Sequence, residues 1–168
     1  MPQQASEPPA KRRRQGDAWQ AAGGGQASPA ANRGDVICWD LAKGSCPRGR
    51  RCRYCHGYVF SCSNSTQEEC QARKLFGSPD RELEQMLACI RPGTELLLFN
   101  FEARKLMGPF KAAGKPGRCV VPGAFGTKFN AQVRVAPPAD APVLEASLDS
   151  RLAAGPLAAA ELEELRAR

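Results

Sequence analysis

Three cysteines and one histidine, spaced C-x7-C-x5-C-x3-H, constrain the fold more than any other feature of this 168-residue chain. They are Cys38, Cys46, Cys52 and His56, the last being the single histidine in the sequence. So short a segment has too little apolar surface to fold on its own. Three thiolates and one imidazole complete a tetrahedral shell around zinc and leave no coordination position open. The spacing therefore predicts one structural Zn²⁺, whose binding supplies the folding free energy of the segment.

Other residues near the cluster bear on this prediction. Gly44 and Gly49 permit the tight turns that wrap a chain around an ion. Cys55 precedes His56 directly, and its thiolate is an alternative to that of Cys52 as the third sulfur ligand. The remaining cysteines are scattered, and we expect them to be small core residues: Cys62, Cys70, Cys89 and Cys119.

The segment over residues 35–57 resembles the Cys-Cys-Cys-His zinc-finger family. Besides the four ligands, the family has glycines at the positions of Gly44 and Gly49 and an aromatic residue at the position of Tyr54. It usually has an aromatic residue where this chain has Leu41. The resemblance implies that the finger binds single-stranded RNA, with aromatic rings stacked between bases and basic side chains along the phosphates.

The charge distribution is consistent with such a partner. Residues 1–60 hold ten Lys and Arg against four Asp and Glu, and the other 108 residues add only +1 to the net charge of +7. The candidate RNA-binding residues of the finger are Trp39, Lys43, Arg48, Arg50, Arg51, Arg53 and Tyr54. A plainer interpretation is that Trp39 and Tyr54 cover the metal core while the arginines are solvated.

The first 33 residues have the composition of a disordered tail, with a triple glycine at 23–25 and no hydrophobic periodicity. Residues 8–14 form a basic cluster of the nuclear-import type. No apolar run approaches the about 20 residues that span a bilayer, and no apolar leader follows Met1. We expect an intracellular protein of the nucleus or cytoplasm, without membrane contact.

The pattern from residue 66 onward predicts mixed helices and strands. A capping box of Thr66 and Glu69 indicates a helix over 66–77, and Ser78 followed by Pro79 indicates a second helix. Buried strands are expected at 95–101, 106–112 and 131–135, a long loop at 114–126 and a helix at 157–168. The apolar face of the second helix is predicted to contain Leu83, Met86, Leu87 and Ile90, and the terminal helix is expected to turn Leu162 and Leu165 inward.

Residues 57–168 resemble the DCD (development and cell death) domain. The family's signature stretches correspond to residues 76–79, 97–99, 130–133 and 142–145. Departures from the family pattern occur at Ser78, Asn130, Pro109 and Lys111. The proline predicts a bulge or an edge position in the strand over 106–112. The resemblance implies a mixed, barrel-like β-sheet with flanking helices, and a role in stress, development and programmed cell death, chiefly in plants.

These observations predict an α+β protein with three parts: a disordered tail over 1–33, a finger over 34–57 and a DCD domain over 58–168. No linker follows His56, so the finger and the domain are expected to keep a fixed orientation. Four cationic residues of the domain are candidates either for a nucleic-acid groove or for a solvated face: Lys105, Lys111, Lys128 and Arg134.

An enzyme is not expected, because zinc takes the only imidazole and no phosphate-binding glycine motif or recognisable carboxylate pair is present. No small-molecule substrate is expected either. The sequence predicts a zinc-binding regulator that binds single-stranded RNA through its finger. The alternative is a protein-interaction adaptor in which the finger is purely structural and a partner docks on the DCD domain.

Overall fold

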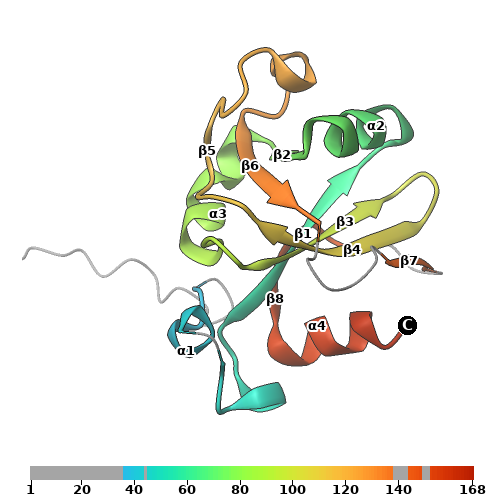
Figure 1. Ribbon diagram of the computed structural model, residues 1–168. Helices are drawn as coiled ribbons and strands as arrows, with labels where there is room; N and C mark the ends of the chain where they lie inside the picture. Colours follow the sequence, from blue (N-terminus) through green and yellow to red (C-terminus); the bar gives the residue numbers. More distant parts are fainter. Residues whose placement is uncertain (1–35, 44, 138–143, 149–151) are drawn as a thin grey trace, which may run out of the picture.

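A computed structural model describes residues 36–43, 45–137, 144–148 and 152–168 of the chain (Figure 1). The predicted tail over 1–33, its basic cluster, Gly44 and the start of the fourth signature stretch lie outside the described residues. The α+β expectation is confirmed, because helices flank a strongly curled sheet that resembles half of a barrel.

Eight strands make up the sheet in the described part of the chain, in the order β2-β6-β4-β3-β1-β8, with β5 paired to β6 and β7 paired to β4. Their bounds are β1 Cys55–Cys62, β2 Leu75–Ser78, β3 Glu95–Asn100, β4 Lys105–Ala112, β5 Gly117–Arg118, β6 Ala131–Ala136, β7 Leu144–Ser147 and β8 Gly155–Ala158. Strands β1 and β3 are parallel and the other pairs are antiparallel.

The helices and short 3-10 turns surround this sheet (Figure 1). The α-helices are α1 Trp39–Ala42, α2 Asn64–Arg73, α3 Leu83–Cys89 and α4 Ala159–Arg166. The 3-10 turns are η2 Gly49–Arg51, η3 Asp80–Glu82 and η4 Ala124–Thr127.

Alternation along the central strands divides the core between the two faces of the sheet. On β1, Tyr58 and Phe60 join the main core with residues of α2 and α3, whereas Val59 faces the opposite side. On β3, Leu97 and Phe99 share that second side with Leu162 of α4. The terminal helix therefore covers one face of the sheet, and α2 and α3 cover the other.

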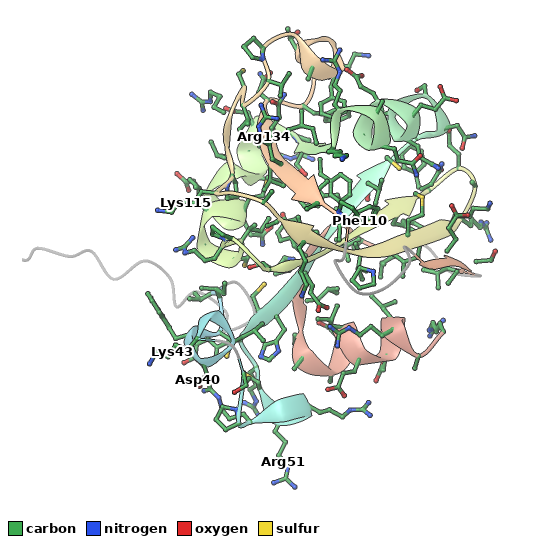
Figure 2. The ribbon with its side chains drawn as sticks, viewed as in Figure 1. Asp40, Lys43, Arg51, Phe110, Lys115 and Arg134 are labelled. Carbon is green, nitrogen blue, oxygen red and sulfur yellow. The ribbon has the colours of Figure 1, made fainter. Side chains whose placement is uncertain are left out.

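Aromatic rings connect three strands inside the main core. The ring centroids of Phe60 on β1 and Phe76 on β2 are 5.4 Å apart. Phe76 in turn meets Phe110 of β4 edge to face at 5.1 Å, and Figure 2 shows Phe110 directed into the interior. Such tilted and edge-to-face pairs are the favoured aromatic geometry, and they stabilise the curl of the sheet.

Three of the predicted strands are confirmed as β3, β4 and β6, with ends within one residue of the expected bounds. Pro109 lies at a bulge in β4, where two residues of that strand oppose the single residue Leu97 of β3, as expected. The predicted long loop also contains β5 and η4, which the glycine- and proline-rich composition did not indicate.

The predicted helix over 66–77 was wrong at both ends. The capping residue is Ser63, and Thr66 is the third residue of the helix, whose hydroxyl accepts the Ser63 backbone N–H at 2.9 Å. The helix ends at Arg73, because Lys74 adopts a left-handed conformation with φ of 50°. Residues 75–78 instead form β2, where burial against the core and pairing with β6 outweigh local helix propensity.

Other local expectations also need correction. Ser78 is the buried last residue of β2 and not a helix cap, and Leu87 is exposed although the periodicity placed it on the buried face. Leu157 belongs to β8, so the terminal helix begins at Ala159. Leu162 is buried and Leu165 packs partly against the same cluster, as expected. Cys119 is exposed and is not a core residue.

Candidate metal centre

The four predicted ligands come from four separate pieces of local structure. Cys38 precedes α1, Cys46 lies in the loop before η2, Cys52 directly follows η2, and His56 is the second residue of β1. Gly49 begins η2 with φ of 49°, a left-handed conformation that glycine adopts without steric cost, as the turn around an ion requires. The segment thus forms a loop whose end, at Cys55 and His56, lies beside its beginning, at Cys38.

Backbone hydrogen bonds attach this loop to the sheet. The Cys38 N–H donates to the Cys55 carbonyl at 3.0 Å, and the Cys55 N–H donates to the Val36 carbonyl at 2.8 Å. The Ile37 N–H donates to Ala88 at the end of α3 at 3.1 Å. The start of the finger is therefore fixed to both β1 and α3.

The ligand atoms of Cys38, Cys46, Cys52 and His56 all lie within 4.8 Å of one another. The sulfur of Cys38 is 3.5 Å from that of Cys46 and 3.6 Å from that of Cys52. Two sulfurs bound at about 2.3 Å to one tetrahedral ion are separated by about 3.8 Å. The spacing of the sulfurs is therefore close to that of a tetrahedral metal site.

His56 carries the clearest sign that the cluster accommodates an ion. Its Nε2 atom is buried and has no hydrogen-bond partner among the described residues. A buried polar atom without a partner is costly, and a bound metal satisfies it. Burial, together with the positive charge of Arg48, lowers the pKa of His56 and keeps the imidazole in the neutral form that binds metals.

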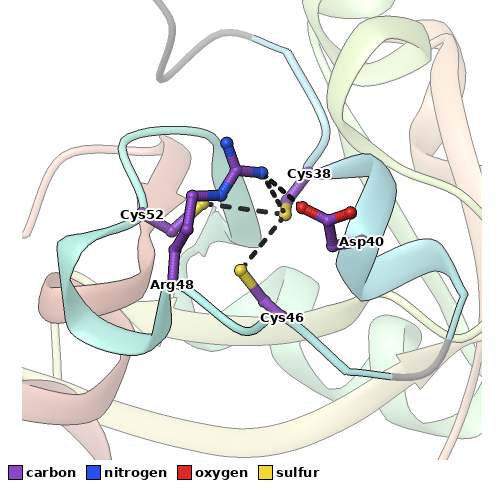
Figure 3. A network of polar contacts seen from close by, with 5 residues as sticks. All are labelled: Cys38, Asp40, Cys46, Arg48 and Cys52. Carbon is purple, nitrogen blue, oxygen red and sulfur yellow. Dashed lines mark hydrogen bonds and ion pairs between the residues drawn. The ribbon is translucent and has the colours of Figure 1, made fainter.

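Arg48 lies beside the sulfurs and forms a second layer around them (Figure 3). Its Nη2 is 3.5 Å from the Cys38 sulfur and 2.7 Å from Asp40 Oδ2, and its guanidinium lies 4.9 Å from the centre of the Tyr54 ring. Three thiolates around a divalent ion would leave one net negative charge, which the Arg48 guanidinium beside them would balance. Such outer contacts orient the ligands and tune the site.

The thiols differ in their protonation equilibria. Burial raises the pKa of Cys52 to about 11. For Cys46, burial acts in the same direction, but hydrogen bonds from Arg48 and the neighbouring thiols outweigh it and lower the pKa. Because a metal binds the thiolate form, loading this site releases protons.

Cys55 is excluded as an alternative ligand by its direction. Its side chain is fully buried in the main core, and its sulfur lies 3.0 Å from the Gly57 carbonyl oxygen. A register shift between Cys55 and Gly57 interrupts the alternation of β1, so Cys55 shares the main core with Tyr58 while His56 belongs to the cluster. Cys62 and Cys70 are also core residues, and burial raises the pKa of each to about 12, which makes them poor nucleophiles.

An apolar shell surrounds the ligands. Leu41 and Tyr54 pack against Cys38 and Cys52, together with the buried Ala159 of the terminal helix. Leu41 thus contributes to this shell at the position where the finger family usually has an aromatic residue. Sequence reasoning did not identify Ala159, which is 107 positions from Cys52 and carries no local signal of the contact.

The predicted RNA-binding residues fall into two groups. Trp39 is 66% exposed, and Lys43, Arg51 and Arg53 are also exposed. Figure 2 shows Lys43 and Arg51 directed away from the body of the protein. These residues form what we call the finger rim.

The other predicted residues are engaged in the fold itself. Tyr54 is half-buried under Arg48. Arg50 pairs with Glu163 of α4 at 3.2 Å and lies 4.0 Å from Glu164. The plainer interpretation therefore describes Tyr54 correctly, but Trp39 is too exposed to act as a cover for the metal core.

The four cations of the DCD region do not share one groove. Lys105 pairs with Glu145 at 3.4 Å, and Lys111 pairs with Glu95 at 2.8 Å. Arg134 is exposed on β6, toward the opposite end of the molecule from Arg51 (Figure 2). Lys128 is exposed directly after η4, and Figure 1 draws the segment between β5 and β6 at the end of the molecule opposite α1. Among the described helices, none is long and apolar enough to cross a bilayer.

Comparison with known proteins identifies relatives that match a little under half of this chain. It is 41% identical over 86 residues to the B2 protein of Daucus carota and to the DCD domain-containing protein NRP-B of Glycine max. It is also 40% identical over 85 residues to the DCD domain-containing protein NRP of Arabidopsis thaliana. These alignments cover 47%, 47% and 46% of this chain, and 41%, 26% and 24% of the relatives.

The chain therefore spans less than half the length of the curated relatives that it matches. The profile of the Development and cell death domain matches residues 56–154, which begin at the last predicted metal ligand and end between β7 and β8. That match covers more than half of the sequence, and the chain belongs to the Development and cell death (DCD) domain family.

Proposed function

We propose that Cys38, Cys46, Cys52 and His56 hold one structural Zn²⁺. The unsatisfied Nε2 of His56, buried beside three convergent sulfurs, is the observation that carries the proposal. Three thiolates and an imidazole form a donor set that zinc prefers, and four protein ligands leave no position for water or substrate. The ion stabilises the loop and performs no chemistry.

We further propose that the finger binds single-stranded RNA. Trp39 is the stacking residue, and the three cations of the finger rim contact the phosphates. The exposure of Trp39 supports this assignment, because its indole ring is accessible for a base to stack on. Tyr54 is the weaker stacking candidate, since the Arg48 guanidinium already lies over its ring.

Fluorescence anisotropy with a labelled random single-stranded RNA pool tests the proposal. Zinc-loaded protein is expected to bind, and chelation is expected to abolish binding. Trp39→Ala should weaken binding by about 10-fold, because base–aromatic stacking contributes about 1–3 kcal/mol per base. Lys128→Gln, a change of an exposed cation remote from the finger, is the matched control and should leave affinity unchanged. Absence of zinc-dependent binding would refute the RNA proposal.

An adaptor with a purely structural finger is the second candidate. It is favoured by the use of Arg48, Arg50 and Tyr54 inside the fold, which removes three predicted contacts from the RNA surface. On that proposal a protein partner docks on the DCD domain, and the zinc-loaded protein does not bind RNA. The anisotropy measurement separates the two candidates directly.

For both candidates we propose a non-catalytic regulator that acts in the nucleus or cytoplasm, in stress, development or cell death. The family description supports the link to development and cell death, and relatives in Glycine max and Arabidopsis thaliana are named for the same domain. The basic cluster over 8–14 supports nuclear import. Fluorescence microscopy of the tagged chain with and without that cluster tests the location.

A further inference from the structure

A cleft of about 460 Å³ lies where the finger, the sheet and the terminal helix meet. Ile37 lines it from the finger, Lys111 from the sheet and Arg166 from α4. Cys46 and His56 also line the cleft, so part of this volume adjoins the candidate metal centre. Because one wall belongs to the finger, the cleft is complete only when the finger is folded.

The charged side chains that line the cleft differ in how far they are exposed to solvent. Lys111 and Arg166 are 42% and 45% exposed, whereas Glu95, to which both are bonded, is only 15% exposed beneath them. Arg91 also lines the cleft, and it donates to the Ile90 carbonyl at 3.1 Å at the end of α3. The remaining carboxylate of the lining, Glu163, is paired with Arg50. Glu95 is therefore the deeper of the two carboxylates, whereas Glu163 is 42% exposed, like Lys111, and is held by Arg50.

The walls beside these cations are partly apolar. Ile37 of the finger and Leu162 of α4 are buried residues that both border the cleft. Such a lining complements a ligand that has an anionic group next to a flat apolar ring. A nucleotide has both, in its phosphate and its base. Inorganic phosphate alone would leave the apolar walls uncovered.

We propose that the cleft holds one nucleotide of the single strand bound by the finger, with its phosphate on Lys111, Arg166 and Arg91 and its base against Ile37 and Leu162. This inference rests on the proposed RNA function and extends it. In this arrangement the DCD domain, through β4 and the turn before β3, contributes directly to recognition.

Glu95→Gln is the sharpest test, because it keeps the shape of the side chain but removes the charge that neutralises Lys111 and Arg166. The nucleotide site predicts tighter binding to the RNA pool, by several-fold, and a steeper dependence of affinity on salt. Lys111→Gln should weaken binding by several-fold and reduce the slope of log K against log salt by about 0.7, the value for one phosphate contact on a single strand. Lys128→Gln is the control and should change neither quantity.

Thermal melting and zinc stoichiometry establish that each variant is folded. If Glu95→Gln does not fold, Arg91→Gln replaces it, since that change leaves both partners of Glu95 in place; it should weaken binding and lower the slope. Zinc-dependent binding that persists with the same affinity and slope in all these variants would overturn the cleft but not the RNA function. A wild-type protein without zinc-dependent binding would overturn both, and weaker binding by folded Glu95→Gln would overturn the cleft, because releasing Lys111 and Arg166 must strengthen a phosphate contact there.

Discussion

Arg50 of the finger lies 3.2 Å from Glu163 of the terminal helix, and this ion pair joins two parts of the chain that are 113 positions apart. Two further contacts reinforce it. Ala159 is buried against the candidate metal ligands Cys38 and Cys52, and Leu162 packs on the face of the sheet that carries Val59 and Phe99. The exposed pair by itself adds little stability. The combination makes α4 a structural bridge between the metal centre and the sheet.

Metal removal is therefore expected to loosen α4 as well as the finger. Without the ion, the loop loses the interactions that position Arg50 and the shell around Ala159. Hydrogen exchange followed by mass spectrometry should show faster exchange in residues 159–166 after chelation. Helix α2 lies against the other face of the sheet and is the internal control, whose exchange should not change. Equal exchange of α4 with and without chelator would contradict the bridge.

Cysteine substitutions should separate the metal ligand from its neighbour. Cys52→Ser should lower zinc affinity by at least 10-fold, because it removes one of three thiolates from the cluster. Cys55→Ser should retain zinc, since the Cys55 side chain lies in the main core. Competition with a chromophoric chelator measures both affinities. The opposite order would show that Cys55 is the ligand.

Gly77 lies in the first family signature and is packed against aromatic rings. A Cβ atom at this position would lie 2.8 Å from a ring carbon of Phe125 and 2.9 Å from Cβ of Phe129. Gly77→Ala should therefore destabilise the fold by about 1–3 kcal/mol through overpacking. Gly114→Ala is the matched control, because nothing lies within 4 Å of the added atom. Denaturant unfolding of the two variants compares them, and equal stability would contradict this packing.

Glu95 should contribute a pH-dependent part of the stability. Burial alone would raise its pKa, but hydrogen bonds from Lys111 and Arg166 outweigh burial and hold the pKa below its ordinary value. A depressed carboxyl pKa gives stability that is present above the ordinary value, about 4.3, and is lost as pH falls through the folded-state value. Because both cations are partly exposed, we expect Glu95→Gln to cost about 1 kcal/mol at pH 7.

Urea unfolding of wild type and Glu95→Gln at a series of pH values measures that difference. The gap between the two proteins should narrow as pH falls below about 4, where the carboxylate of the wild type becomes protonated. Loss of zinc in acid is expected to loosen α4, which carries Arg166, so the same pH series on chelator-treated proteins separates the two effects. A gap that stays constant with pH would show that the two ion pairs do not stabilise the fold.

Much of the architecture follows from patterns that are local in the sequence. The strands around Leu97 and Val133 are short apolar runs between turn signals, and the structure confirms both as β3 and β6. The prediction that the helix continues to residue 77 was wrong because Leu75 and Phe76 pair with β6. This pairing stabilises the extended conformation more than local propensity favours the helix. Pairing partners distant in sequence leave no trace in a single segment, so local propensity cannot anticipate them.

The sequence by itself determined which residues converge on the metal centre, because the spacing of Cys38, Cys46, Cys52 and His56 is a property of one short segment. Only the tertiary structure decided that Cys55 points into the core, that Arg48 covers Tyr54 and that Arg50 binds Glu163. The physical reason is the range of the interactions. A metal gathers ligands across short loops, whereas burial and ion pairs depend on which distant strands and helices the completed fold brings alongside.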